Sequence, residues 1–530
     1  MSNNILATNI ISLDSYNRIN NFARTNPRIN QITDFLFSEF SISSTNDPKI
    51  VKRFEKDASN IVGKAEALCR PSNEKECALI LCTLNKLSIE VTISAGRTSL
   101  TGGATPNRGF VISMEQMNKP KPQVNVSLKT VISPVGIYLE NMRNEVLIQS
   151  DNSLYYPVDP TSRKEATIGG TVSCNASGFT PGPKGATRYW TSYLEFLTAD
   201  GHKISCNRGQ YISKNGEFSI STSTKSFILK VPTYSRPKIK NASGPFSDES
   251  GEMDLVDFIV GSEGIYGLIT LVGFKLDDKP KDFLDIYFTL SSEEASIKFY
   301  NYIKDKLDND LSKLTAFEYF GHNCQSYMDF SEDFFKNNSD TGIYIQVPIY
   351  SKSVDKVSEF WFETLVNSGC DINVDEIIIF SSTSHRKKFF NSRHSIPINA
   401  WERSTKLGTP NIMTDTIVPS ENFGKFLKLA HQSLEEADIE YVLFGHLGDC
   451  HLHFHFMPTV DQVILATKIY ENLVEISANL GGVYSAEHGT GKRKLKDFKK
   501  CFGNKGVEQI KISKIGIDSN YILNKGNIIA

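Results

Sequence analysis

Histidines gather in one short stretch of this chain. Four of the ten lie in GHLGDCHLHFHF (445–456), and His488 follows in the segment AEHGTGK. The alternation after residue 450 predicts a β-strand, because successive side chains of a strand point to opposite faces. His451, His453 and His455 would then share one face, opposite an apolar face of leucine and phenylalanine. Three charged imidazoles about 7 Å apart would repel one another when buried, so we expect them to be neutral, hydrogen-bonded or metal-bound. The stretch is the first candidate for an active site.

Nearby residues add metal-ligand and anion-binding chemistry. His446 and His453 flank a Gly-Asp turn, and Glu487 directly precedes His488. Two imidazoles and a carboxylate form a three-ligand site with a position left open for substrate, as in catalytic zinc centres. A single histidine is more often a core residue, but four in one stretch favour a functional role. Arg393, in FFNSRHSIP, is either a solvated surface residue or a two-pronged partner for a substrate carboxylate.

Three glycine-rich turns lie between residues 94 and 270. They are SAGRTSLTGG (94–103), DPTSRKEATIGGTVSCNASG (159–178) and VGSEGIYGLIT (260–270). Such turns expose backbone N–H groups that bind phosphate or pyrophosphate. None matches GxGxxG or GxxxxGK[ST], and each alone is equally consistent with a structural turn. Three of them at strand–helix junctions favour a large nucleotide cofactor.

Composition narrows the class of protein. A chain of 530 residues predicts two or three domains. The 58 basic and 60 acidic residues nearly cancel, which argues against nucleic acid or an anionic membrane as the main partner and favours a small molecule. Nine cysteines without a CxxC pair indicate reduced thiols in a cytoplasmic setting and argue against an iron–sulfur cluster. No apolar run reaches the roughly 18 to 20 residues of a spanning helix, and the N-terminus does not read as a signal peptide. A peripheral membrane contact through a surface patch stays open.

Local patterns place the supporting elements. We expect a helix at 74–87 followed by a strand at 90–94, a strand and turn at 194–201, a helix at 292–307, and β-rich runs at 342–349 and 376–380. A helix at 32–40 would dock the N-terminal segment, to which we assign no function. The polar segment 232–252 is expected to be an exposed loop. A composition shift places a domain boundary near residue 280.

Taken in order, the motifs resemble the FAD-linked oxidase family that includes D-lactate dehydrogenase, D-2-hydroxyglutarate dehydrogenase and the glycolate oxidase flavin subunit. The likeness runs from about residue 46 to the end, through RPSNEKEC, ISAGRTSLTGGATP, VDPTSRKEATIGGTVSCNASG, VGSEGIYGLIT, GHLGDCHLHFHF, AEHGTGK and DSNYILNKGNII. The resemblance implies an α+β fold. A two-part FAD-binding domain of the vanillyl-alcohol-oxidase (PCMH) type at 46–280 would follow an extension at 1–45, and an α+β substrate domain at 281–530 would cap it.

The resemblance also assigns roles. His446, His453 and Glu487 match metal ligands, for zinc first and iron or manganese as alternatives, and His455 stands near the metal at the substrate. Arg393 matches the residue that binds the substrate carboxylate, and His488 matches the catalytic base. The residues assigned to the flavin are Ser94, Ala95, Gly96, Arg97, Thr98, Ser99, Leu100, Thr101, Gly102, Gly103, Pro157, Asp159, Thr167, Ile168, Gly169, Gly170, Asn175, Ala176, Gly178, Gly261, Glu263 and Gly264. No histidine precedes His202, which excludes a histidyl-flavin bond from the first loop and predicts dissociable FAD.

Departures from the family motif bear on the substrate. Where the family reads GDGN, this chain has Cys450 and His451, and His451 either adds a fourth imidazole or crowds the site. The threonine and lysine that contact the distal carboxylate in the D-2-hydroxyglutarate enzymes align with Pro397 and Met413. We therefore expect oxidation of a small D-2-hydroxyacid, D-lactate or glycolate before D-2-hydroxyglutarate, with hydride transfer to FAD and a quinone or cytochrome-type acceptor. The alternatives are an enzyme like alkyl-dihydroxyacetone-phosphate synthase, a flavin-binding subunit without turnover, and a structural protein. The oligomeric state is not predicted.

Overall fold

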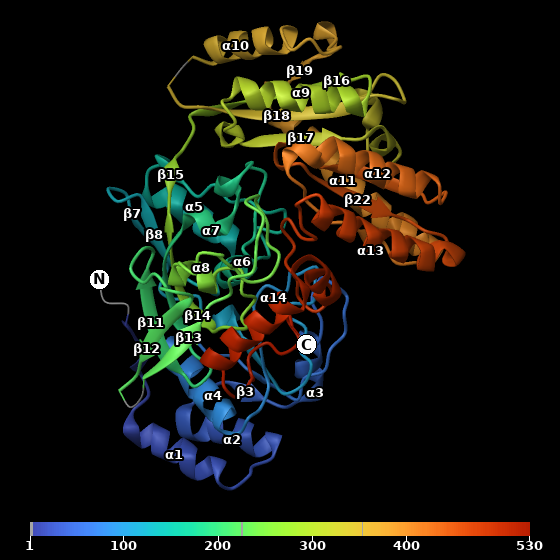
Figure 1. The fold of residues 1–530 in the computed structure, drawn as a ribbon. Helices are drawn as coiled ribbons and strands as arrows, with labels where there is room; N and C mark the ends of the chain where they lie inside the picture. The colour runs from blue at the N-terminus through green and yellow to red at the C-terminus, as the bar shows by residue number, and fades with distance from the viewer. Residues whose placement is uncertain (1–3, 224–225, 352, 530) are drawn as a thin grey trace.

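The computed structural model describes residues 4–223, 226–351 and 353–529. Two units are stacked in it (Figure 1). The cap unit, residues 282–479, is built on a seven-stranded sheet, and the N-terminal unit comprises residues 4–281 together with the end of the chain from 495. The segment 480–494 connects them and carries Glu487 and His488.

A four-stranded sheet opens the N-terminal unit, in the order β3-β4-β6-β5, with β4 and β5 both parallel to β6. Its strands are β3 (Ser44–Thr45), β4 (Ala67–Cys69), β6 (Phe110–Ser113) and β5 (Val91–Ser94). The predicted helix is confirmed as α4 (Glu74–Lys86), which begins at the capping side chain of Asn73, and β5 confirms the strand that follows it. The short helix α3 (Pro48–Val51) precedes β4. The first glycine-rich turn therefore leaves the carboxyl end of β5.

The second sheet has six strands in the order β2-β11-β10-β14-β8-β7. They are β2 (Thr8–Asn9), β11 (His202–Asn207), β10 (Thr191–Leu197), β14 (Leu268–Lys275), β8 (Thr130–Pro134) and β7 (Gln123–Asn125), accompanied by helices α5 (Leu139–Gln149), α6 (Ile168–Cys174), α7 (Thr187–Trp190) and α8 (Leu255–Ile259). A two-stranded pair joins β9 (Leu154–Tyr155) to β15 (Asp277–Asp278). The other two glycine-rich turns lie in this half, so the two sheets hold all three turns.

The N-terminal segment is part of this unit. Its strand β1 (Asn4–Leu6) pairs in parallel with β12 (Glu217–Ser221), which also pairs with β13 (Ser226–Lys230). Helices α1 (Leu13–Ala23) and α2 (Ile29–Phe40) follow, and Ile32 and Leu36 of α2 are fully buried in the unit's main core. The expected docking helix is confirmed.

The cap unit holds an antiparallel sheet in the order β19-β16-β18-β17-β21-β22-β20. Its strands are β19 (Ile378–Ile379), β16 (Asp282–Leu290), β18 (Thr341–Ile349), β17 (Ala316–Phe320), β21 (Tyr441–His446), β22 (His451–Phe456) and β20 (Ile412–Met413). Side chains from α9 (Glu293–Lys306), α10 (Val354–Val366), α12 (Phe423–Glu435) and α13 (Val463–Asn479) share one core on one face. Helix α11 (Thr383–Leu407) packs on the other face through Phe389, Ile396 and Ala400.

The end of the chain returns to the N-terminal unit. Helix α14 (Leu495–Ile517) buries Phe498, Ile510 and Ile517 in the main core of that unit, and Figure 1 shows it lying across this part. The tail then adds to the edge of β5, where Val91 N donates to Ile522 O at 2.8 Å. A boundary near residue 280 stays a prediction, and the last residues of the chain pack with the flavin half.

One sequence expectation is wrong: the segment 232–252 is not an exposed loop. Ser243 is fully buried and Tyr234 is 5% exposed. Its polar groups are satisfied by the protein itself, since Arg236 donates to the carbonyls of Asn241, Ser243 and Pro245. Ala242 N also donates to Ser485 O, which ties the segment to the connector between the units. Over the described ranges, no helix is both long and apolar enough to cross a membrane.

Candidate active site

The histidine stretch forms the hairpin of β21 and β22. His446 and His451 are direct cross-strand partners, and the turn between them passes through Cys450 at a positive φ of 55°. Along β22 the side chains alternate as predicted, because Leu452, Phe454 and Phe456 all pack into the helix-covered core of the cap unit. The imidazoles occupy the other face. All four histidines of the hairpin are buried.

Glu318 of β17 joins two of the predicted site residues. Its Oε1 accepts from His446 Nδ1 at 2.6 Å, and its Oε2 accepts from Arg393 Nη2 at 2.7 Å. Arg393 is buried, which excludes the surface interpretation of this residue. Nε and Nη2 of Arg393 both donate to Glu318, so Nη1 is the guanidinium nitrogen left to donate to a second anion. Burial by itself would raise the pKa of Glu318, but the attraction of His446 and Arg393 outweighs burial and lowers that pKa to about 2.

Glu487 lies among the imidazoles. Its Oε1 is 3.3 Å from His453 Nε2, 3.6 Å from His446 Nε2 and 3.7 Å from His488 Nε2. Despite burial, Glu318 and Glu487 raise the pKa of His446 to about 10, so this imidazole must lose a proton before it can bind a metal. The fold thus brings the three predicted ligands, His446, His453 and Glu487, together. His451 joins them: one ligand atom from each of the four lies within 4.8 Å of the others.

Asp415, just after β20, is the second carboxylate that sequence reasoning missed. It is fully buried, accepts from Lys494 Nζ at 2.7 Å and lies 3.6 Å from His488 Nδ1. The backbone N–H groups of Glu487 and His488 also donate to it, which fixes the predicted base in place. Burial lowers the pKa of His488 to about 4 against the pull of Asp415 and Glu487, so the imidazole is neutral at pH 7.

A signal for both missed acids exists in the sequence. Glu318 stands inside the apolar run AFEYF, and Asp415 precedes the apolar TIV. An acid inside an apolar strand pattern indicates a buried, paired charge. His455, predicted at the substrate, is also buried on β22, and burial lowers its pKa to about 3.

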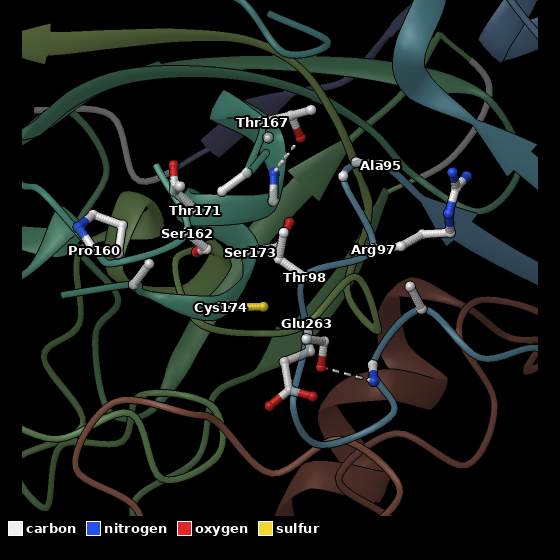
Figure 2. A pocket seen from close by; sticks show the side chains of 18 of the residues that line it. Ala95, Arg97, Thr98, Pro160, Ser162, Thr167, Thr171, Ser173, Cys174 and Glu263 are labelled. Carbon is white, nitrogen blue, oxygen red and sulfur yellow. Dashed lines mark hydrogen bonds between the residues drawn. The ribbon is translucent and has the colours of Figure 1, made fainter. Parts of the chain in front are cut away.

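A cavity of about 670 Å³ lies between the glycine-rich turns and reaches the histidines. The predicted flavin residues that line it are Ala95, Gly96, Arg97, Thr98, Ser99, Leu100, Gly103, Asp159, Thr167, Gly169, Gly170, Ala176, Gly178, Glu263 and Gly264. The others, Ser94, Thr101, Gly102, Pro157, Ile168, Asn175 and Gly261, are not among its lining residues. Figure 2 shows Thr167, Thr171 and Ser173 on one wall and the loop from Ala95 to Thr98 facing them.

Several lining residues were missed. They include Thr171, Ser173, Cys174, Phe179 and Asn524. Asn524 comes from the returning tail, where its side-chain N–H donates to Glu263 O at 2.7 Å. His446, Glu487 and His488 line the same cavity as the glycine-rich loops. The predicted cofactor loops therefore face the same cavity as His446, Glu487 and His488, whereas Arg393, His453 and His455 are not among its lining residues.

The cavity suits a large cofactor. Its volume lies within the range of roughly 300 to 1,000 Å³ that ligand sites occupy. A Cβ added at Gly170 would meet only Thr167 Oγ1 within 4 Å, so the backbone here borders open space that a ligand can approach closely. Glu263 is held by the amides of Thr490 and Gly491 at 2.7 Å each, and burial nevertheless raises its pKa to about 7.

Comparisons with known proteins agree with this geometry. Residues 65–207 match the FAD binding domain family, and residues 360–528 match the family described as FAD linked oxidases, C-terminal domain. Together these matches cover more than half of the chain.

Three curated relatives align over most of the chain. A D-2-hydroxyglutarate dehydrogenase of Xanthomonas citri pv. viticola is 24% identical and covers 87% of this chain and 89% of its own length. A D-lactate dehydrogenase of Anaerostipes hadrus is 25% identical, with 91% and 93% covered. The glycolate oxidase subunit GlcD of Bacillus subtilis is 24% identical, with 88% and 89% covered.

Among solved structures, an alkyldihydroxyacetonephosphate synthase superposes with a TM-score of 0.63 at 14% identity, covering 94% of this chain and 84% of that one. The likeness confirms the expected α+β fold with its FAD-binding part of the PCMH type. From both domain matches and from the cavity that joins the two domains, the chain belongs to the FAD-linked oxidases and is an FAD-dependent oxidoreductase.

Proposed function

We propose that this protein oxidises a small D-2-hydroxyacid to the 2-oxoacid. The observation that carries the proposal is the shared cavity, in which His446, Glu487 and His488 face the same space as the flavin loops. When bound, FAD supplies the hydride acceptor. The loops 95–100 and 167–170 would hold it through backbone N–H groups, and the names of the relatives support this class of substrate.

His488 is the proposed base. A neutral, buried imidazole that lines the cavity can take the hydroxyl proton, and Asp415, 3.6 Å from its Nδ1, stabilises the charge that follows. A divalent ion held by His446, His453 and Glu487 would supply Lewis acidity to the substrate hydroxyl. Nη1 of Arg393 is the edge available for the carboxylate, with Glu318 orienting the guanidinium, and His455 stays proposed as a neighbour at the substrate.

We propose a monocarboxylate, D-lactate or glycolate, ahead of D-2-hydroxyglutarate. Among the described residues that line the cavity, Arg97 is the sole lysine or arginine, and it pairs with Glu115 at 3.1 Å. Pro397 and Met413 do not line the cavity. Arg393, which is not among the lining residues, is proposed for the first carboxylate, so a second one would have only Arg97 among the lining lysines and arginines, and Arg97 is already paired.

Electrons would leave the flavin for a quinone or a cytochrome-type acceptor. All nine cysteines are free, which supports the proposal of a reducing, cytoplasmic setting.

Anaerobic bleaching of the flavin tests the function. D- and L-lactate, glycolate and D-2-hydroxyglutarate are added in turn to FAD-loaded protein, with and without a chelator. We expect rapid bleaching by D-lactate or glycolate, and its loss on chelation. Bleaching by L-isomers alone would overturn the stereochemistry, and strong bleaching by D-2-hydroxyglutarate would favour that dehydrogenase activity instead. Yellow protein that no hydroxyacid bleaches would favour a flavin-binding subunit or a chemistry like that of the synthase.

A further inference from the structure

We propose that His451 is a fourth protein ligand of the divalent ion, so that the site consists of three imidazoles and one carboxylate. The inference rests on the proposed metal-dependent function and names a ligand beyond His446, His453 and Glu487. It also changes which ion the site suits, from four-coordinate zinc to an ion that takes six ligands.

The first support is distance. Ligand atoms of His446, His451, His453 and Glu487 all lie within 4.8 Å of one another. Atoms that bind one ion at about 2.1 Å lie about 3.0 Å apart in adjacent positions of a six-ligand shell and about 4.2 Å apart in opposite positions, so closing the site needs side-chain shifts of about 1 to 2 Å. The ring of His451 is also the nearest histidine ring to that of His453, with centroids 4.5 Å apart against 5.9 Å for His446.

The second support is an unmet requirement of a buried side chain. His451 has no solvent exposure, and its Nδ1 makes no hydrogen bond to any residue in the described ranges. A buried polar atom without a partner costs about 1 to 3 kcal/mol. Its Nε2 lies 3.2 Å from Asp415 Oδ1, although not aligned as a hydrogen bond. A ligating imidazole commonly donates its other N–H to such a carboxylate, and metal binding would satisfy the two nitrogens of His451 in this way.

The third support is charge. Three buried carboxylates, those of Glu318, Asp415 and Glu487, meet in this cluster, whereas its permanent cations are Arg393 and Lys494. Arg393 pairs with Glu318 and Lys494 with Asp415, so within the described ranges the charge of Glu487 has imidazoles alone as its ion-pair partners. A divalent ion compensates it at the point where the imidazoles and Glu487 converge.

The coordination number follows. Four protein ligands would fill the tetrahedral shell that zinc prefers, and no position would remain for substrate. A hydroxyacid that chelates through hydroxyl and carboxylate needs two more positions, which makes six. Ions such as Mn²⁺, Fe²⁺ and Co²⁺ accept six ligands that include imidazole and carboxylate. The site is therefore built for one of these ions.

Cobalt(II) is the probe. FAD-loaded protein is stripped of metal and titrated with Co²⁺ by calorimetry, and X-ray absorption at the cobalt edge counts the imidazoles and the total ligands. We expect three imidazoles and six ligands in the wild type. His451→Asn should show two imidazoles and at least 100-fold weaker Co²⁺ binding. His431→Asn, which removes a half-buried histidine of helix α12 in the same unit and outside the ligand group, should keep three imidazoles and bind within about threefold of wild type.

Two imidazoles in the wild type, an unchanged count in His451→Asn, or no stoichiometric Co²⁺ binding would each overturn the inference. The wild-type spectrum is decisive by itself if His451→Asn does not fold. Flavin bleaching separates this from the proposed function. If a hydroxyacid bleaches the flavin but the cobalt spectrum shows two imidazoles, the proposed function is supported and His451 is not a ligand. If the spectrum shows three imidazoles but no hydroxyacid bleaches the flavin, His451 is a ligand and the proposed function is wrong.

Discussion

The exchange Glu318→Gln tests whether one buried carboxylate holds the cap unit's half of the site. Glu318 is 2% exposed, and it accepts from both His446 and Arg393. Glutamine has nearly the same shape, so the change removes charge and leaves the packing. Arg393, with its side chain 7% exposed, would then be a buried cation without its carboxylate.

Removing one partner of a buried ion pair costs about 3 to 5 kcal/mol, because the remaining charge keeps its desolvation penalty and loses its attraction. The cap unit spans roughly 200 residues, and in units of this size each kcal/mol shifts the melting temperature by about 2 to 4 °C. We therefore expect the cap-unit transition of Glu318→Gln to fall by about 6 to 20 °C.

Differential scanning calorimetry measures this shift. The control is Glu440→Gln, which makes the same exchange in the Glu440–Arg403 pair of the same unit, where the side chains are 40% and 44% exposed and the pair is worth about 0 to 1 kcal/mol. Glu318→Gln combined with Arg393→Met should lose less stability than the two changes summed, by about 1 to 3 kcal/mol. A shift no larger than that of Glu440→Gln, or strict additivity, would refute the reasoning.

Three further changes test the cavity, the base and a buried acid. Gly170→Leu directs a side chain into space where only Thr167 Oγ1 lies near, so the affinity for FAD should fall at least tenfold in a flavin-fluorescence titration. The control Gly424→Ala, in α12, should retain the wild-type affinity. Equal FAD affinities of the two variants would place the flavin elsewhere. His488→Ala should stay yellow and folded while flavin reduction slows by about 10² to 10⁴-fold in stopped flow, and near-normal rates would exclude it as the base. Glu263 has its pKa raised by burial to about 7, above the 4.5 of an unperturbed group, so its contribution to stability is complete below pH 4.5 and is lost as pH rises through 7. Glu263→Gln should remove this pH-dependent loss of about 3 kcal/mol, measured as melting temperature from pH 5 to 8, and parallel profiles for both proteins would contradict it.

The elements of the structure that the sequence predicted well are those that a local residue pattern determines. The alternation in HLHFHF predicted β22 because a strand's faces follow from its own sequence. The first glycine-rich loop was likewise located by its own composition, and most of its residues line the cavity. Glu318 could not be paired with His446 in the same way, since 128 residues separate them and only the sheet order brings β17 beside β21. The segment 232–252 was misjudged because its polar residues bond to the protein instead of to water.

The wider arrangement explains why the ligand atoms converge. His446 Nδ1 faces Glu318 at 2.6 Å, and His453 Nδ1 faces the carbonyl of Thr414 at 3.3 Å. With Nδ1 engaged, Nε2 of each ring is the nitrogen directed at Glu487, at 3.6 and 3.3 Å. The next residue, Asp415, lies beside His451 and His488. Glu318 therefore engages Nδ1 of His446 and Thr414 engages Nδ1 of His453, and these partners behind the two rings leave Nε2 of each free for a metal before any metal binds.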